Sequence, residues 1–244
     1  MLRIDINCDV GEGLQNEALL MPYISSCNIA CTAHAGSIES IDLVIQLAKQ
    51  HGVKIGAHPS FPDRVNFGRR VINITPEKLE KSIIEQIELL KQRLELADQS
   101  LHHIKMHGAL YNLSAKDIPT AEIVLKAVKK SAPNTILYAP DNSQITRLAE
   151  SQGIKIKREA FADRNYNEDL SLVSRKQNNA LITDKDQAFE HLSRMIFEGS
   201  VETVSGIITP IKAETFCVHG DNSNAIELVT YIHKNLINQG VHIG

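Results

Sequence analysis

The sequence lacks the features that would indicate export, membrane insertion or binding to nucleic acid. Its first residues contain no basic segment followed by an apolar one, so we expect a cytoplasmic protein. No apolar stretch approaches the roughly 20 residues that a membrane-spanning helix needs. The 26 basic residues nearly balance the 29 acidic ones, and a net charge of -3 is too small to favour nucleic acid or a membrane surface. We therefore expect a small-molecule substrate.

Nucleotide-binding motifs and paired cysteines are also missing. The chain has neither G-x-x-x-x-G-K-[ST] nor a G-x-G-x-x-G between a strand and a helix. The glycine turns after His34, His107 and His219 would still offer backbone N–H groups to phosphate oxygens, which is a weaker signal. No two cysteines form a C-x-x-C pair, which favours buried, reduced thiols over disulfides. The cysteines are Cys8, Cys27, Cys31 and Cys217.

Strand-like apolar runs alternate with helical patterns along the whole chain, which is typical of a parallel sheet covered by helices. No linker or change of composition divides the sequence, so we expect a single α/β domain over residues 1–244. Thr75 and Pro76 predict the start of a long helix, and Gly52 predicts the end of an earlier one. The expected strands cover residues 3–9, 26–32, 53–58, 102–107, 135–139, 154–162 and 214–219. The expected helices cover residues 41–48, 76–90, 118–131, 142–152, 185–198 and 223–239.

Four of the apolar runs end in a histidine that is followed within two residues by glycine or proline. These histidines are His34, His58, His107 and His219. Polar side chains that lie at equivalent strand ends are how an α/β barrel assembles an active site. The pattern therefore predicts an enzyme with a barrel fold.

Alternation along the expected strands places polar side chains in rows. Asp5, Asn7 and Asp9 share one face of the first strand, and the apolar residues between them share the other. Polar groups that point into a barrel are unfavourable unless they bond one another or a ligand, so the row predicts a polar, convergent interior. The alternative is a face that is solvated. Similar rows occur at Lys54 and His58, at His103, Lys105 and His107, and at Cys217 and His219.

Six motifs connect the sequence to a known family. In chain order they are DINCDVGEG, SSCNIACTAHAG, IGAHPSFPDRVNFGRR, KMHGALYN, FADRNYN and CVHGDN. Together they resemble the LamB/YcsF family, and the resemblance runs from Asp5 to Gly240. Ser37 departs from the pattern at a position where an aspartate is usual.

The resemblance implies a seven-stranded parallel (β/α) barrel of the glycoside hydrolase/deacetylase type. It also implies one component of an enzyme that cleaves 5-oxoproline to L-glutamate with hydrolysis of ATP to ADP and phosphate, in a complex with two further subunits. ATP with Mg²⁺ would be a co-substrate, and we expect no tightly bound metal. Because nucleotide motifs are missing, we expect the partners to bind ATP and this chain to complete ring opening. The loops at 60–72 and 164–182 are expected to contact them.

The chemistry of opening a lactam assigns roles to the residues at the strand ends. Water needs a base, the departing nitrogen needs an acid, and phosphate and carboxylate groups need cations. The expected catalytic residues are Asp9 and Asp163 as base or base-orienting carboxylates, His58, His107 and His219 as proton exchangers, and Lys105 as a cation. The expected substrate-binding residues are Glu12, His34, Arg69, Arg70, Arg164 and Asp221.

Other polar residues have structural interpretations. Asp5 and Asn7 are expected in a network at the base of the barrel. Asp141 and Asp221 precede expected helices and would serve as N-caps, although Asp221 also lies next to His219. The histidines expected to be solvated are His51, His102, His191, His233 and His242.

Two other functions fit parts of the sequence. A metal-dependent polysaccharide deacetylase-like hydrolase would use Asp9, His34 and His58, because an aspartate and two histidines form a known arrangement for a divalent metal. A non-catalytic binding module for lactams or sugars would not need so many ionisable groups inside the barrel.

Overall fold

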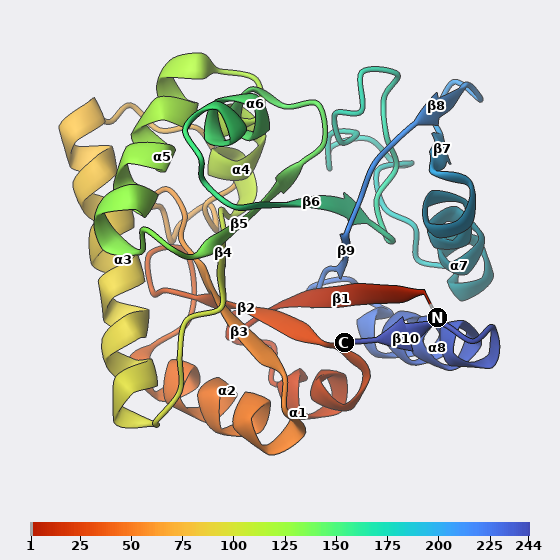
Figure 1. Ribbon diagram of the computed structural model, residues 1–244, viewed down its shortest axis with the longest axis horizontal. Helices are drawn as coiled ribbons and strands as arrows, with labels where there is room; N and C mark the ends of the chain where they lie inside the picture. The colour runs from red at the N-terminus through yellow and green to blue at the C-terminus, as the bar shows by residue number, and fades with distance from the viewer. Residues whose placement is uncertain (1) are drawn as a thin grey trace.

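The computed structural model describes residues 2–244, and its centre is a closed barrel of parallel strands (Figure 1). The barrel strands are β1 (Arg3–Val10), β2 (Ser26–Ala30), β3 (Lys54–His58), β4 (His103–Lys105), β5 (Ile136–Pro140), β6 (Ile156–Phe161) and β9 (Thr215–Val218). Each strand pairs with the next in this order, and β9 also pairs with β1, which closes the barrel. The predicted seven-stranded parallel barrel is confirmed.

The helices pack around the outside of the barrel (Figure 1). Those that correspond to predicted helices are α2 (Ile38–His51), α3 (Pro76–Leu96), α5 (Ile118–Ser131), α6 (Gln144–Ser151), α7 (Lys185–Ser193) and α8 (Ala225–Asn238). Thr75 caps α3 with its side chain, and Gly52 ends α2 in the left-handed conformation, with φ of 67°. After α7 the chain makes a π-helical turn, η2 (Arg194–Glu198), that ends at Gly199. Within residues 2–244 no helix has the length and hydropathy needed to cross a membrane.

The sequence does not predict the short elements of the fold. They are α1 (Glu17–Leu20), η1 (Met21–Tyr23), α4 (Gly108–Ser114), β7 (Ser200–Glu202), β8 (Ile208–Pro210) and β10 (His242–Ile243). All but α4 are too short for a hydrophobic period to be recognised. β7 and β8 form an antiparallel hairpin, and β10 pairs with the start of β1, which brings the two ends of the chain together (Figure 1).

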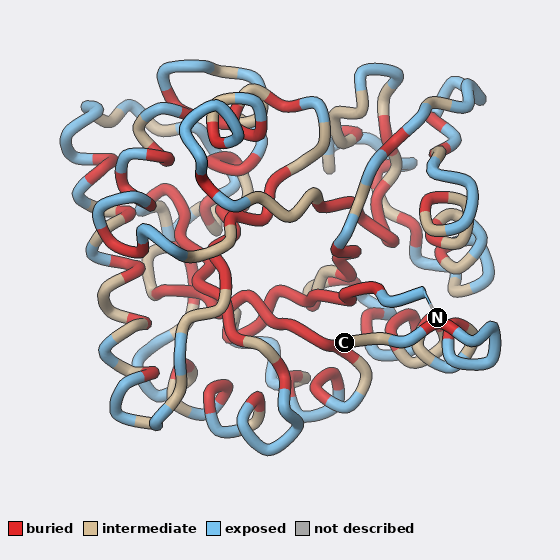
Figure 2. Tube along the Cα trace, viewed as in Figure 1, coloured by how far each residue is buried: buried red, intermediate tan, exposed pale blue. Residues whose placement is uncertain are grey.

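Strands β1 and β2 of the barrel wall are buried along nearly their whole length (Figure 2). Side chains such as Ile6, Ile29 and Ile104 belong to the apolar core that joins strands and helices. All four cysteines are buried and free, as predicted. The position of the strands is therefore fixed from outside by apolar packing, which leaves the interior available for polar groups.

The interior of the barrel is polar, and side chains there hydrogen-bond one another. Asp5 is 1% exposed and accepts hydrogen bonds from Thr215, Ser26 and the Tyr138 hydroxyl at 2.6, 2.8 and 3.1 Å. Burial raises the pKa of Asp5, but the charge of Lys157 and these hydrogen bonds bring it below its usual value. This face is not solvated, and Asp5 belongs to the structural network expected at the base of the barrel.

Two predicted helix caps are wrong. Ser143, rather than Asp141, caps α6, because the chain continues past the aspartate before the helix begins. Asp141 instead accepts a hydrogen bond from the backbone N–H of Lys212 at 3.0 Å. Asp221 does not cap α8, whose N-cap is Asn224. Its carboxylate forms ion pairs in the cavity described below.

The sequence predicts that His191 is solvated, but the structure shows it half-buried. Its ring stacks on Tyr166 with 5.9 Å between centroids, and its Nε2 is buried without a partner. Burial lowers the pKa of His191 to about 4. His51 and His242 are exposed, as predicted, whereas His102 and His233 are half-buried.

We expect His191→Gln to reduce the acid sensitivity of the protein. The histidine takes up a proton near pH 6.5 in the unfolded chain but only near pH 4 in the folded one. Between these values the unfolded state binds more protons than the folded state. The free energy of unfolding therefore decreases as the pH is lowered from about 6.5 to about 4, by up to about 3 kcal/mol for this group. Urea unfolding at about pH 7 and about pH 4.5 measures the loss, with His233→Gln as the control. The expectation would be contradicted if the free energy of unfolding decreased equally in the His191 variant and the parent between the two pH values.

Candidate active site

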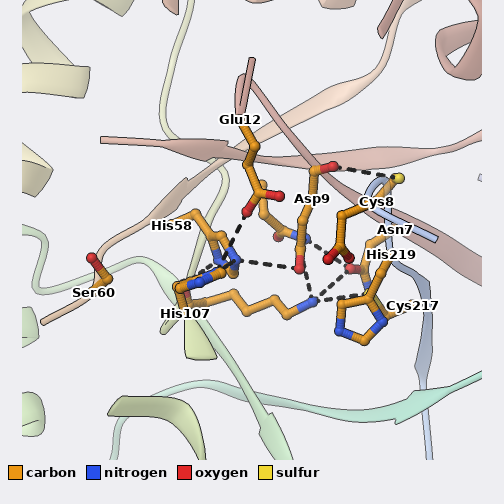
Figure 3. A network of polar contacts seen from close by, with 12 residues as sticks. Asn7, Cys8, Asp9, Glu12, His58, Ser60, His107, Cys217 and His219 are labelled. Carbon is orange, nitrogen blue, oxygen red and sulfur yellow. Dashed lines mark hydrogen bonds and ion pairs between the residues drawn. The ribbon is translucent and has the colours of Figure 1, made fainter. Parts of the chain in front are cut away.

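A cavity of about 950 Å³ opens at the carboxyl ends of the barrel strands. Ten of the twelve residues predicted for the site line it. Of the other two, Asp163 contacts His219 and His34 contacts Glu12, so each lies behind a lining residue. Figure 3 shows that Asp9 lies between His58 and His107 on one side and His219 on the other. The predicted residues that line the cavity are Asp9, Glu12, His58, Arg69, Arg70, Lys105, His107, Arg164, His219 and Asp221.

Lys105 lies at the floor of this cavity and is already paired. Its Nζ is 2.9 Å from Asp9 Oδ1, 2.9 Å from Glu159 Oε1 and 3.1 Å from Cys217 Sγ. Burial favours the neutral amine, but Asp9, Cys217 and Glu159 raise the pKa of Lys105 well above its usual value. The side chain is 2% exposed. Its charge is therefore balanced inside the protein before any anionic substrate arrives.

Three histidines from the ends of β2, β3 and β4 meet beside Asp9. The rings of His34 and His107 stack with 3.8 Å between centroids. His58 Nε2 lies 3.0 Å from His107 Nδ1 and 3.3 Å from Asp9 Oδ2. Burial and the neighbouring His58 lower the pKa of His34 to about 3, and burial with the adjacent imidazoles lowers the pKa of His107 well below its usual value. Both rings are therefore neutral near pH 7.

Glu12 completes this cluster from the loop after β1. Gly11, with φ of 73°, turns the chain so that the Glu12 side chain enters the protein, where it is 2% exposed. Its Oε1 is 3.4 Å from His34 Nε2 and 3.5 Å from His107 Nδ1. Burial and the charge of Asp9 raise the pKa of Glu12 well above its usual value.

His219 and Asp163 form a hydrogen-bonded pair on the other side of Asp9 (Figure 3). Asp163 accepts hydrogen bonds from His219 Nδ1 at 2.9 Å, from the His219 backbone N–H at 3.1 Å and from Asn222 Nδ2 at 3.2 Å. Burial raises the pKa of Asp163, but His219 and these hydrogen bonds bring it below its usual value, so the carboxylate stays ionised. The pair orients the imidazole and leaves Nε2 for the cavity.

Cations gather at the rim of the cavity. Asp221 pairs with Arg69 and with Arg175, whose Nη1 and Nη2 lie 2.9 and 3.2 Å from its two oxygens. Arg70 and Lys176 also line the rim. Burial raises the pKa of Asp221, but Arg175 and His219 bring it below its usual value. Two of these cations pair with Asp221 and two more line the cavity, so this part of it has a net positive charge, which suits an anionic ligand.

Arg164 has a structural contact in addition to its place on the cavity wall. Its guanidinium donates hydrogen bonds to the carbonyls of Val173 and Ala180 at 2.7 and 3.2 Å, and so holds the loop at 164–182 in place. Burial beside Arg175 lowers the pKa of Arg164 to about 10. Two of its five donors are therefore used within the protein.

Sequence reasoning missed Asn28, Glu159 and Arg175. Asn28 lies in the interior row of β2 and donates to Asp9 Oδ1 at 2.8 Å, and Glu159 lies in the same kind of row on β6. The alternation that singled out Asp9 would also have found these two residues. Arg175 comes from an irregular loop without a periodic pattern, so no comparable signal marks it.

Three groups of side chains bring possible metal-ligating atoms within 4.8 Å of one another. The groups are Asp9, His58 and His107; Glu12, His34 and His107; and Asp9, Cys217 and His219. The set that the deacetylase alternative would use does not form, because His34 Nε2 faces Glu12 instead of Asp9.

Comparison with known proteins gives a consistent result. The model of the LamB/YcsF family matches residues 4–244. The chain is 40% identical over 250 residues to the A subunit of 5-oxoprolinase from Clostridium beijerinckii, which covers all of this chain and 97% of the relative. It is also 40% identical over 247 residues to the protein of the same name from Geobacillus thermodenitrificans, with 100% and 96% covered.

A solved structure agrees with these matches. The crystal structure of the lactam utilization protein from Thermus thermophilus has a TM-score of 0.93 and 35% sequence identity, and the match covers 99% of each chain. The similarity therefore includes the barrel and the loops that surround the cavity. In both sequence and fold, the chain belongs to the LamB/YcsF family.

Proposed function

We propose that this chain is the ring-opening subunit of an ATP-dependent 5-oxoprolinase. The complex would cleave 5-oxoproline to L-glutamate and hydrolyse ATP to ADP and phosphate. The observation that carries the proposal is one cavity that holds both an oriented Asp163–His219 pair and a rim rich in arginine. Relatives named as the A subunit of 5-oxoprolinase, which match over the whole chain, support the choice of substrate.

The side chains of the cavity divide the work of opening an activated lactam. His58 and Lys105 hold the pKa of Asp9 well below its usual range despite burial, so Asp9 orients a water molecule and His58 accepts its proton. Water attacks the carbonyl carbon of the phosphorylated lactam, the ring C–N bond breaks, and His219 gives the nitrogen a proton. The acyl phosphate that remains is hydrolysed by a second water molecule, which releases phosphate and leaves the carboxylate of glutamate. Arg69 and Arg175 hold the carboxylate or phosphate of the substrate.

ATP enters the proposal through partner subunits. An amide carbonyl is a poor electrophile, and phosphorylation of its oxygen would prepare it for attack by water. This chain has no recognisable nucleotide motif. Two further subunits would therefore bind ATP with Mg²⁺ and phosphorylate 5-oxoproline. The loops at 60–72 and 164–182 carry Arg69 and Arg175 to the rim and would contact those subunits.

A reconstitution experiment tests this function. The purified chain alone should form little or no glutamate from 5-oxoproline and ATP, because the step that consumes ATP takes place elsewhere. Addition of the two partner subunits should restore glutamate formation, with ADP released in parallel. Glutamate and ADP are measured separately, so that ATP hydrolysis without ring opening is recognised.

Two outcomes would contradict the proposal. One is rapid turnover of 5-oxoproline by the single chain with ATP, and the other is failure of the partners to stimulate it. Acetate release from an N-acetylated oligosaccharide is assayed in parallel, because activity in that assay would favour the deacetylase-like hydrolase instead.

A further inference from the structure

We propose that Asp9, His58 and His107 bind a divalent transition-metal ion at the carboxyl ends of β1, β3 and β4. Zn²⁺ and Co²⁺ are ions of the kind that these ligands bind. Two imidazole nitrogens and one carboxylate oxygen converge there from three different strands (Figure 3). The proposal concerns binding alone; in the metal-bound state the ion takes the position on His58 Nε2 of the proton that this nitrogen accepts in the function proposed above.

The hydrogen bonds on the outer sides of the rings fix where their protons are. His58 Nδ1 lies 2.8 Å from the carbonyl oxygen of Lys105, and His107 Nε2 lies 2.9 Å from the carbonyl oxygen of Phe67. A carbonyl oxygen only accepts hydrogen bonds, so both of these nitrogens carry the proton. His58 Nε2 and His107 Nδ1 therefore present lone pairs to each other. Outer hydrogen bonds of this kind are typical of histidines that ligate a metal.

The distances between these inner atoms match the spacing of ligands around one ion. His58 Nε2 is 3.0 Å from His107 Nδ1 and 3.3 Å from Asp9 Oδ2. Ligands that are each about 2.1 Å from a shared ion lie about 3.0–3.5 Å apart. Two lone pairs at this separation repel each other unless a cation lies between them. Two of the three separations thus match those of neighbouring ligands in a tetrahedral or octahedral site, and the third, between Asp9 and His107, is within 4.8 Å.

A fourth ligand and an open side are also present. Glu12 Oε1 is 3.5 Å from His107 Nδ1, and it is 3.4 Å from His34 Nε2. His34 Nδ1 lies 2.9 Å from Ser60 Oγ, whose hydroxyl donates to the Phe61 carbonyl, so His34 also directs a lone pair inward. Asp9, His58 and His107 all line the cavity, which leaves coordination positions for water or substrate.

The chemistry of the donors selects the kind of ion. Imidazole nitrogen combined with carboxylate oxygen suits Zn²⁺ and its neighbours, whereas Mg²⁺ and Ca²⁺ prefer oxygen ligands alone. In the other group near Asp9, with Cys217 and His219, the sulfur is already occupied, because Lys105 Nζ lies 3.1 Å from Cys217 Sγ.

Metal titration of the whole chain tests the proposal without any activity assay. Protein treated with a chelator and then dialysed is titrated with ZnCl₂ by calorimetry and with CoCl₂ by visible absorption at neutral pH. We expect about one equivalent of each ion, a Kd on the order of 1 µM or tighter, and visible bands for bound Co²⁺. MgCl₂ should bind at least about 100-fold more weakly.

Variants locate the ion. His58→Ala and Asp9→Asn should each weaken Zn²⁺ binding by about 100-fold, while His102→Ala, a half-buried histidine outside the cluster, should not. Circular dichroism and thermal melts identify any variant that fails to fold, and Asp9→Asn preserves the shape of the side chain. His34→Gln should weaken binding by less than about 10-fold.

Three results would overturn the assignment. The first is the absence of stoichiometric Zn²⁺ or Co²⁺ binding, which would mean that a proton, and not a metal, lies between His58 and His107. The second is wild-type affinity in His58→Ala. The third is a loss in His34→Gln as large as in Asp9→Asn, which would place the ion between Glu12, His34 and His107 instead.

Discussion

Lys105→Met is expected to lower the free energy of unfolding by about 3–5 kcal/mol, the usual cost of removing one partner from a buried ion pair. The Lys105 amine is the cation between Asp9 and Glu159, whose side chains are 5% and 0% exposed. Methionine fills a similar volume but leaves both carboxylates without this counter-charge. Within residues 2–244, Glu159 Oε2 has no hydrogen-bond partner, so this oxygen gains no compensation when the lysine is removed. Urea unfolding at neutral pH measures the change.

Two further variants separate this explanation from a general loss of packing. Lys157→Met removes a lysine that is 23% exposed and 3.7 Å from Asp5, and it should cost no more than about 1 kcal/mol. The double variant Lys105→Met with Glu159→Gln should lose less than the sum of the two single variants, because it removes a cation together with one of its anions. A Lys105→Met protein within about 1 kcal/mol of the parent would show that the carboxylates can be neutralised at little cost.

The polar interior could be predicted from the sequence because it follows the period of a strand. Asp5, Asn7 and Asp9 alternate with apolar residues, and in a barrel with helices outside such a row has to point inward. The same reasoning extends to Glu159 on β6. Two of the strand ends could be predicted too, because β3 ends at His58 and β9 ends one residue before His219.

The partners of these side chains could not be predicted in the same way. Lys105 pairs with Asp9 on β1 and Glu159 on β6, and this choice depends on which strands face each other across the closed barrel. Arg175 reaches Asp221 from an irregular loop, where no periodicity fixes the direction of a side chain. His191 Nε2 is buried and the ring stacks on Tyr166, a tertiary contact that helical periodicity alone does not reveal.

His219→Ala is expected to reduce ring opening by the reconstituted complex about 100-fold or more, the scale of losing a general acid or base. Asp163 holds the imidazole through Nδ1, so Nε2 is the atom that can exchange a proton with a ligand in the cavity. Because the groups proposed to bind substrate anions are the arginines of the rim and not His219, the loss should be mainly in kcat, with a smaller change in KM. Glutamate formation is followed under saturating ATP, so that activation by the partners does not limit the rate.

Asp163→Asn is the matched test of this role, because it keeps the shape of the side chain and removes its charge. The amide cannot accept hydrogen bonds as the carboxylate does from both His219 Nδ1 and the His219 backbone N–H, so the ring loses its fixed orientation. We expect a fall in kcat of about 100-fold or more, as for His219→Ala, and little further loss in the double variant, since the two residues act as one unit. His233→Ala, on the outer helix α8, should retain full turnover. If the His219 variant unfolds, or if its melting temperature falls by as much as that of Lys105→Met, the imidazole supports the fold and the proton reaches the nitrogen from another group.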